Sequence, residues 1–310
     1  MTVPAVLVEA FAERPCSGNG AAVVLLRQPL DAAVLQALAA SLKQSETAFL
    51  LRDGEHWLLR WFTPSCEVNL CGHATLAATL ALGHWRMLRP GTSLALHSRS
   101  GPLVVELEAG RQGAAHIELP AGVLQPVAAE PELRAYLHRH LGVAALEACW
   151  HSSLNYRVLL LPSTAPLAGA QLPAAELPEE VRPGLVLMQA LPEGATHTVL
   201  GRPCHYQLRF LAPGLGIPED PVTGSAHALV APWWLQRLGL NEVVGWQCSH
   251  RPGGMVCEAA SSGMIRLCGA GHLLWDGSLR LDPWPGGEPS SAACGLEPPA
   301  SVAGWRSLLP

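Results

Sequence analysis

The stretch Arg60–Ala77 reads RWFTPSCEVNLCGHATLA, and Arg209–Trp234, which reads RFLAPGLGIPEDPVTGSAHALVAPWW, follows the same plan. Each begins with an arginine-led apolar run that a proline stops, passes through a loop, and enters an apolar segment at a glycine. The apolar segments, 74–88 and 226–238, are apolar nearly all round, which is typical of buried helices. The repeat predicts two similar α/β halves, each a curved sheet around one buried helix, with both helix starts at a shared cleft.

The rest of the chain supports a strand-rich fold. Residues 31–42 have the spacing of an amphipathic helix. Apolar runs bounded by turn residues predict strands over residues 5–11, 21–27, 56–62, 103–108, 156–161, 185–188, 206–211 and 264–268.

The domain organisation follows from these elements. We expect a first half over residues 1–112, a second half over 113–281, and a Pro/Gly-rich C-terminal appendage over 282–310. The Pro/Ala-rich segment 167–184 is expected to be a surface connection within the second half.

The amino-acid composition disfavours nucleic-acid-binding and membrane proteins. The chain has 310 residues, 49% of them hydrophobic, with 15% charged residues and a formal net charge of −5. A chain of this kind can bury a large core and has no basic footprint for nucleic acid, so a small-molecule partner is expected. It has no run of about 18 apolar residues, which predicts a cytoplasmic protein without membrane contact. Nine cysteines without a C-x-x-C motif favour free thiols in a reducing compartment.

Two common kinds of site are disfavoured by the motifs. Cys66, Cys71 and His73 lie close together, but no second pair at zinc-ligand spacing follows, so we expect no metal. The sequence TGSAH at Thr223–His227 is not the G-x-S-x-G of a serine hydrolase.

A carboxylate in QSETAFLL (Gln44–Leu51) is a better candidate for chemistry. Glu46 comes just before an otherwise apolar strand, where burial would raise its pKa toward neutrality and make it a usable proton acceptor. Taken alone, Glu46 would equally fit a solvated residue at a strand end.

Two predicted helix starts, each led by a glycine, could act together with Glu46. Unpaired backbone N–H groups at a helix N-terminus favour an anion, and Gly72-His73 and Gly224-Ser225 each begin a predicted helix. A single start of this kind would be only a helix cap. A substrate carboxylate held by both starts, with Glu46 on one side and His73 and Asp220 on the other, would allow a proton to be moved on carbon.

These residues also carry a family resemblance. Together with SGNGAAVVLL (Ser17–Leu26), the three motifs resemble those of the PhzF-like phenazine-biosynthesis family, relatives of diaminopimelate epimerase, in order over roughly residues 5–281. The resemblance implies an α+β fold of two pseudo-symmetric halves with the active site between them and no cofactor. It is compatible with a homodimer.

The resemblance also implies roles for individual residues. It gives Glu46 the role of general acid/base, makes His73 and Asp220 further catalytic positions, and makes Gly72, Gly224 and Ser225, with Asn19, positions that bind substrate. The implied activity is that of a cofactor-independent isomerase acting on a small carboxylate-bearing metabolite.

Two rival functions stay open from the sequence. Diaminopimelate epimerase and proline racemase use two cysteines, one from each half; Cys71 resembles the first, but the second half has Val222 and Thr223 at the corresponding place. We therefore expect Cys71 to be a packing residue at the helix start. An amino-acid or hydroxy-acid racemase or epimerase, and a binding protein of the same fold without turnover, remain the alternatives.

Overall fold

The computed structural model describes residues 2–281 and 304–309, which form two units. The first unit comprises Met1–Ala10, Gly20–Ile117 and Gly271–Pro310, and the second comprises Phe11–Asn19 and Glu118–Ala270. The sequence predicted two contiguous halves, whereas these units exchange short segments at their ends. The physical reason is strand β19 (Met264–Arg280), which starts in the second unit and ends in the first, where it pairs antiparallel with β1 (Thr2–Ala10).

The first unit is a closed barrel of mixed strands. Strands pair in the order β1–β2–β3–β4–β6–β7–β8–β19, and β19 returns to β1. Its further elements are β2 (Asn19–Leu26), α1 (Ala32–Leu42), β3 (Glu46–Asp53), β4 (His56–Phe62), β5 (Glu67–Val68), α2 (Gly72–His84), β6 (Ser93–Ser98), β7 (Gly101–Leu107) and β8 (Ala114–Pro120).

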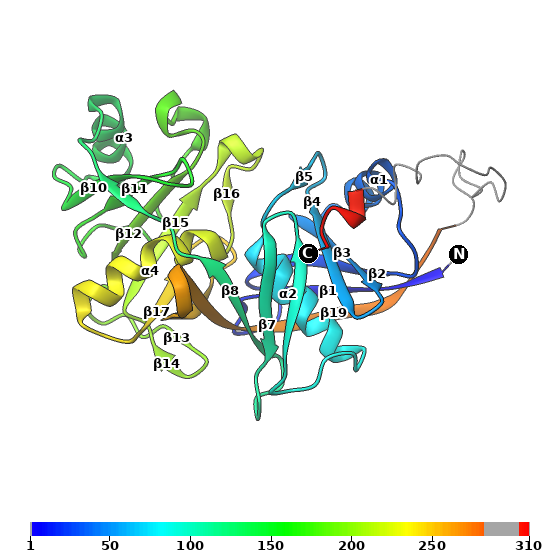
Figure 1. The fold of residues 1–310 in the computed structure, drawn as a ribbon. Coiled ribbons are helices and arrows are strands. Elements are labelled where there is room, and N and C mark those ends of the chain that lie inside the picture. The colour runs from blue at the N-terminus through cyan, green and yellow to red at the C-terminus, as the bar shows by residue number, and fades with distance from the viewer. Residues whose placement is uncertain (1, 282–303, 310) are drawn as a thin grey trace. The chain divides into compact units, whose positions relative to one another are not determined.

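Helix α2 is enclosed by this barrel. It contacts strands β1, β3 and β7, which lie at separate places around the ring (Figure 1). Its sequence GHATLAATLALGH is dominated by small and aliphatic side chains, and nearly every residue from Gly72 to Leu82 is buried. Small residues let the helix approach strands on all sides, which explains why its apolar pattern has no polar face.

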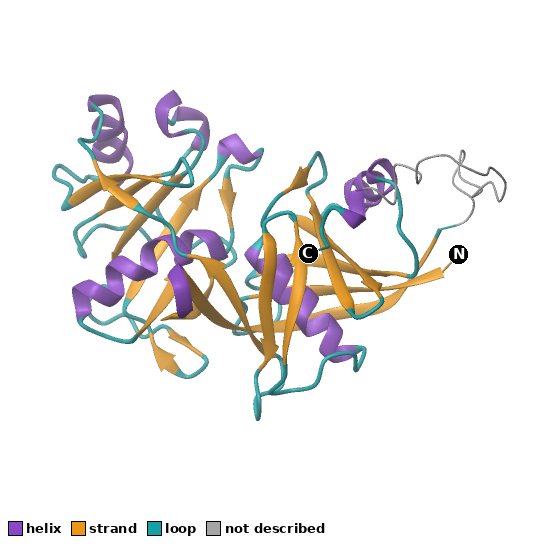
Figure 2. Ribbon diagram, in the orientation of Figure 1, coloured by secondary structure: helices purple, strands orange, loops and turns teal. Residues whose placement is uncertain are grey.

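The second unit repeats the plan with few helices among many strands (Figure 2). The strands pair in the order β19–β18–β17–β15–β12–β11–β10–β9, and α4 packs on β17 and β18. The elements are β9 (Leu124–Pro126), α3 (Pro131–Leu141), β10 (Ala148–Ser152), β11 (Arg157–Leu160), β12 (Leu185–Ala190), β15 (Tyr206–Leu211), β16 (Glu219–Asp220), α4 (Gly224–Leu238), β17 (Glu242–Gln247) and β18 (Gly253–Ala259), with a separate hairpin of β13 (Thr198–Val199) and β14 (Arg202–Pro203).

Strand register confirms the repeat predicted from the two motifs. In the first unit β2 and β3 are parallel, β3 and β4 antiparallel, and β4 and β6 parallel across α2. In the second unit β11–β12, β12–β15 and β15–β17 follow the same sequence of directions, with α4 as the crossover. Arg60 pairs bidentately with Glu67, and Arg209 pairs bidentately with Glu219, at matching positions of β4–β5 and β15–β16.

Two regions expected at the surface are in fact packed. The segment 167–184 contributes Leu167, Leu177 and Val181 to the core of the second unit, because these side chains pack in one cluster with residues of β12. In the C-terminal region, residues 282–303 lie outside the described part, but Trp305 is 1% exposed and packs in the first unit's core. The appendage expected from composition therefore ends in a docked segment.

Two further observations concern the class of protein. The eight cysteines within the described residues are free thiols, as the sequence predicted. Over residues 2–281 and 304–309, no helix has both the length and the apolar character needed to cross a membrane.

Candidate active site

The first unit brings Glu46, His73 and Cys71 together at the start of α2. Glu46 is the first residue of β3, and its Oε2 atom lies 3.0 Å from Nε2 of His73. On the other side of the imidazole, Nδ1 lies 3.5 Å from Sγ of Cys71, the N-cap residue of α2. The His73 side chain is 5% exposed and that of Glu46 is 18% exposed, so the carboxylate is the member of the group that solvent reaches.

The protonation states of this group follow from its burial and charges. Burial alone would lower the pKa of His73, but the sulfur of Cys71 and the carboxylate of Glu46 raise it well above 6.5. Burial, together with the charge of Glu46, raises the pKa of the Cys71 thiol to about 11. Because that thiol is protonated at neutral pH, Cys71 lacks the thiolate character of a nucleophile.

The same three side chains could in principle hold a metal, since one donor atom of each lies within 4.8 Å of the others. The orientation of the ring argues against a chelate. Each imidazole nitrogen faces a different neighbour, so one ion bound to a single nitrogen could not replace both contacts. The imidazole lies between the Cys71 thiol and the Glu46 carboxylate, with one nitrogen toward each, and metal independence stays a prediction.

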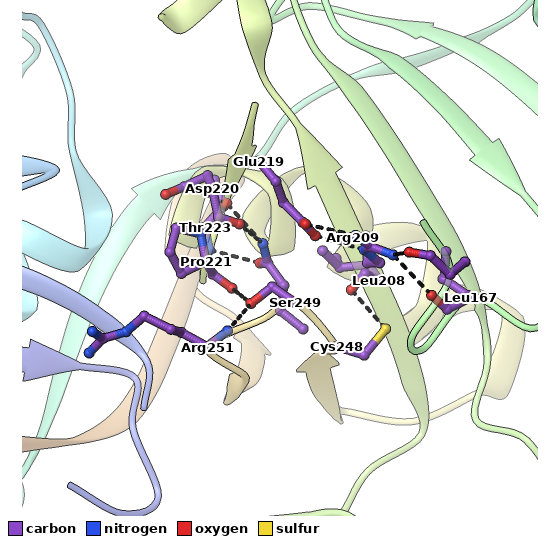
Figure 3. A network of polar contacts seen from close by, with 12 residues as sticks. Leu167, Leu208, Arg209, Glu219, Asp220, Pro221, Thr223, Cys248, Ser249 and Arg251 are labelled. Atoms are coloured by element: carbon purple, nitrogen blue, oxygen red, sulfur yellow. Dashed lines mark hydrogen bonds and ion pairs between the residues drawn. The ribbon is translucent and has the colours of Figure 1, made fainter. Parts of the chain in front are cut away.

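The second unit holds Asp220 in a buried polar network (Figure 3). Asn19 donates from Nδ2 to Oδ1 of Asp220 at 2.7 Å, and the Thr223 hydroxyl donates to Oδ2 at 2.5 Å. Asn19 also donates to the carbonyl of Val222 at 3.1 Å. These donors orient the carboxylate and hold the loop that leads into α4, where Thr223 is the N-cap residue.

Gln247 is a further member that the sequence analysis missed. Its side chain is fully buried, accepts from the backbone N–H of Thr223 at 2.8 Å and donates to the carbonyl of Asp220 at 2.7 Å. It lies at the end of β17, 27 residues from Asp220, and no local pattern marks it. Tyr156 was missed as well: burial and the charge of Asp220 raise its pKa, while Ser225 acts in the opposite direction.

The site residues predicted from the sequence thus divide between the units. Glu46, Gly72 and His73 lie at the start of α2, and Asn19, Asp220, Gly224 and Ser225 lie at the start of α4. Within each unit the structure brings the residues together around one helix N-terminus.

Register comparison shows that the two helix starts are chemically different. Phe49 is opposite Arg60 and Leu187 is opposite Arg209, so counting back along β3 and β12 matches Glu46 with Gly184. The N-cap positions match Cys71 with Thr223, and the second helical positions match His73 with Ser225. The carboxylate, thiol and imidazole of the first unit therefore correspond to a hydrogen, a hydroxyl and a hydroxyl in the second.

The space that a side chain at Gly184 would need is filled by an aromatic ring. A Cβ atom there would lie 2.4 Å from the ring of Tyr156, which packs against Phe210 with ring centroids 4.8 Å apart. The second unit thus places the ring of Tyr156 at the position that matches Glu46 in the first unit.

A histidine does lie in the first turn of α4, but it is neutral. His227 is fully buried, and desolvation lowers its pKa to about 3. Burial raises the pKa of Tyr206 well above 10, and its hydroxyl is hydrogen-bonded to Nδ1 of His227 at 2.8 Å. The positive end of the helix dipole disfavours an imidazolium at this position too. His227 is therefore a core residue of the second unit.

Comparison with known proteins gives a consistent family signal. The family model described as phenazine biosynthesis-like protein (PhzC-PhzF) matches residues 8–269. An uncharacterized isomerase from Pseudomonas aeruginosa is 38% identical over 275 residues, covering 88% of this chain and 97% of the relative. The crystal structure of a phenazine biosynthesis protein of the PhzF family from Enterococcus faecalis aligns with a TM-score of 0.78 at 30% identity, covering 91% of this chain and 100% of that one.

A more distant likeness bears on the fold alone. A probable proline racemase from Agrobacterium radiobacter aligns with a TM-score of 0.61 at 10% identity over 91% of this chain and 94% of that one. This confirms the epimerase-like fold class expected from the sequence. The expected enzyme class, an isomerase, is the class named for the Pseudomonas relative.

Proposed function

Because the chain belongs to the phenazine biosynthesis-like protein family, we propose that it is a cofactor-independent isomerase that moves a proton on carbon next to a substrate carboxylate, with Glu46 as the general acid/base. The observation that supports this assignment most is the contact of 3.0 Å between Glu46 and His73 at the start of α2. It joins a partly exposed carboxylate, able to reach a substrate, to a buried imidazole that holds it.

The proton transfer needs no electron acceptor. The Glu46 carboxylate takes the proton of a C–H bond, and the electron pair of that bond is delocalised toward the adjacent carboxylate of the substrate. Glu46, now neutral, returns the proton to another carbon or to the same one, so that atoms and charge balance. His73, whose pKa is raised well above 6.5, keeps a positive charge 3.0 Å from the Glu46 carboxylate and holds that group in place.

The backbone supports the negative charge that develops. The N–H groups in the first turn of α2, from Gly72 onward, lack acceptors within the helix and lie at the positive end of its dipole. The first turn of α4, from Gly224, has the same character. We assign the substrate carboxylate to helix N-termini of this kind because preorganised donors stabilise an oxyanion without reorganising during the reaction.

The chemical difference between the helix starts favours a single base. A racemase that uses one base on each face needs a proton-transferring group from both halves. In the second unit Gly184, Thr223 and Ser225 occupy the positions that match Glu46, Cys71 and His73. Asp220 is the carboxylate there, and both of its oxygens accept hydrogen bonds from Asn19 and Thr223. We therefore assign Asp220 to orientation and Glu46 to proton transfer.

The test starts from a bound carboxylate. A panel of small carboxylic acids is screened for an increase in thermal stability, because a ligand that binds only the folded state stabilises it. The acid that stabilises most is incubated with the enzyme in D2O, and deuterium on its carbons is measured by NMR. Wild type should incorporate deuterium. Glu46→Gln should bind the same acid within about tenfold, or 1.4 kcal/mol, and exchange at least ~100-fold more slowly.

Glu55→Gln is the matched control, because Glu55 is an exposed carboxylate in the turn between β3 and β4. It should exchange at the wild-type rate. An equal rate in Glu46→Gln would remove Glu46 as the base. Inversion at a single carbon of the product would favour the racemase or epimerase alternative, and binding without exchange in the wild type would favour a binding protein.

A further inference from the structure

The C-terminal segment, residues 304–309, is docked into the first unit. Its first three residues are helical, and Trp305 and Leu308 are 1% and 6% exposed in the same apolar core as Phe49, Leu58 and Phe62. The indole N–H of Trp305 donates to the carbonyl of Leu30 at 3.1 Å. The segment lies beyond residues 8–269, which match the family model.

Trp305 also contacts a buried charge. The guanidinium carbon of Arg60 lies 5.1 Å from the Trp305 ring and 5.2 Å from the Phe62 ring, within the range of cation–π contacts. Arg60 is 3% exposed and donates from Nε and Nη2 to both oxygens of Glu67 at 2.7 and 2.8 Å. A buried bidentate pair depends on geometry, and a ring on the guanidinium restricts where the plane of that group can lie.

Glu67 connects this pair to the start of α2. It lies in β5, which has only two residues and pairs with β4 at two positions. With so short a ladder, the side-chain contacts of Glu67 help to hold the loop between β4 and α2: the bidentate pair with Arg60, and an ion pair of 2.8 Å from its Oε2 to Nη2 of Arg99. Four residues after Glu67 the chain reaches Cys71, the N-cap residue, and then His73.

The second unit supports this interpretation because it covers the matching arginine by other means. Arg209 pairs with Glu219 in the same bidentate way. There the remaining guanidinium nitrogen, Nη1, donates to the carbonyls of Leu167 and Ala170 at 3.3 and 2.5 Å. The guanidinium of Arg209 is thus contacted by residues from the middle of the chain, whereas that of Arg60 is contacted by the C-terminal segment.

We propose that Trp305 is a positioning residue for the candidate active site: by fixing Arg60 on Glu67 it fixes the loop that sets His73 against Glu46. The inference rests on the proposed role of His73. Its test follows the titration of His73, which depends on how close His73 lies to Glu46. It can therefore fail or succeed independently of the exchange experiment with Glu46→Gln.

The experiment follows the titration of His73 by NMR in full-length protein labelled with ¹³C-histidine. The His73 signal is assigned by its loss in His73→Asn. In Trp305→Leu, which keeps apolar bulk and removes the ring face, the midpoint of His73 should shift from the wild-type value toward 6.5, because His73 loses its set distance from Glu46. Trp305→Phe keeps a ring on Arg60 and should restore the wild-type midpoint.

Leu308→Ala is the matched control, because Leu308 is buried in the same core. It should lower thermal stability and leave the His73 midpoint unchanged. Arg60→Lys removes the bidentate pair with the segment intact and should reproduce the shift of Trp305→Leu, with no further shift in the double variant. An unchanged midpoint in Arg60→Lys, or equal shifts in Trp305→Leu and Leu308→Ala, would show that the segment only fills the core and would overturn the proposal. Arg60→Lys keeps the test decisive if Trp305→Leu does not fold.

Discussion

The protein should become less stable in mild acid because burial lowers the pKa of His227 in the folded state. In the unfolded chain this imidazole takes up a proton near pH 6.5, whereas in the folded protein desolvation delays protonation to about pH 3. Between these values the unfolded state binds one more proton, so the free energy of unfolding falls as the pH falls. The expected slope is about 1.4 kcal/mol per pH unit, which integrates to about 2 kcal/mol between pH 7 and pH 5.

The perturbation that isolates this effect is His227→Asn. The asparagine amide takes the place of Nδ1 and can still hydrogen-bond with the Tyr206 hydroxyl, which in the wild type lies 2.8 Å from that nitrogen. Asparagine does not titrate, so the variant should lose about 2 kcal/mol less than the wild type over the same pH range. Loss of packing in the variant lowers its stability equally at each pH and cancels from the comparison.

The assay is urea unfolding followed by fluorescence at pH 7, 6 and 5, for wild type and variant. His73→Asn gives a comparison of opposite sign. Since the folded pKa of His73 is raised above 6.5, its stabilising contribution is fully present below pH 6.5 and is lost as the pH rises through the folded value. If wild type and His227→Asn show parallel pH dependence, His227 is protonated in the folded state, and its assignment as a neutral core residue is wrong.

Two further outcomes concern Cys71 and metals. Cys71→Ala should retain most of the deuterium exchange of the wild type. The Cys71 thiol, whose pKa is raised to about 11, is protonated at neutral pH, and the matching residue in the second unit is Thr223. A loss of exchange as large as that of Glu46→Gln would restore a mechanism that uses the thiol. Chelating agents should leave exchange intact, and elemental analysis should find no stoichiometric metal, because one imidazole nitrogen of His73 faces Cys71 and the other faces Glu46. Stoichiometric zinc whose removal stops exchange would contradict this prediction.

Local sequence rules predicted the elements that repeat. The strands 56–62 and 206–211 occur with the predicted bounds, and the helices predicted over 74–88 and 226–238 begin two residues earlier, at Gly72 and Gly224. Period, glycine and proline act over a few neighbouring residues, so such elements can be read from the chain. Helix α3 carried the same kind of signal, with Pro131 in its first turn and Gly142 at its C-cap, and could have been found from it.

Only part of the candidate site could be predicted from the sequence. The sequence and its family resemblance pointed to Glu46, His73 and Asp220, but the order of contacts from Cys71 through His73 to Glu46 depends on the register of β3 beside α2. The donors that hold Asp220 come from Asn19, 201 residues away, and from Gln247 at the end of β17, which positions the start of α4. Such contacts leave no periodic trace in the sequence.

By itself the amino-acid sequence determined the repeated strand-loop-helix plan, the buried helices and the family motifs, because each depends on residues close together in the chain. Tertiary structure alone decided that the segment after residue 303 docks, that Trp305 lies on Arg60, and that Gly184 matches Glu46. A Pro/Gly-rich composition predicts little local structure, yet one large apolar ring can dock such a chain where the burial of apolar surface outweighs the entropy of ordering it. That balance depends on the surface which the rest of the fold presents.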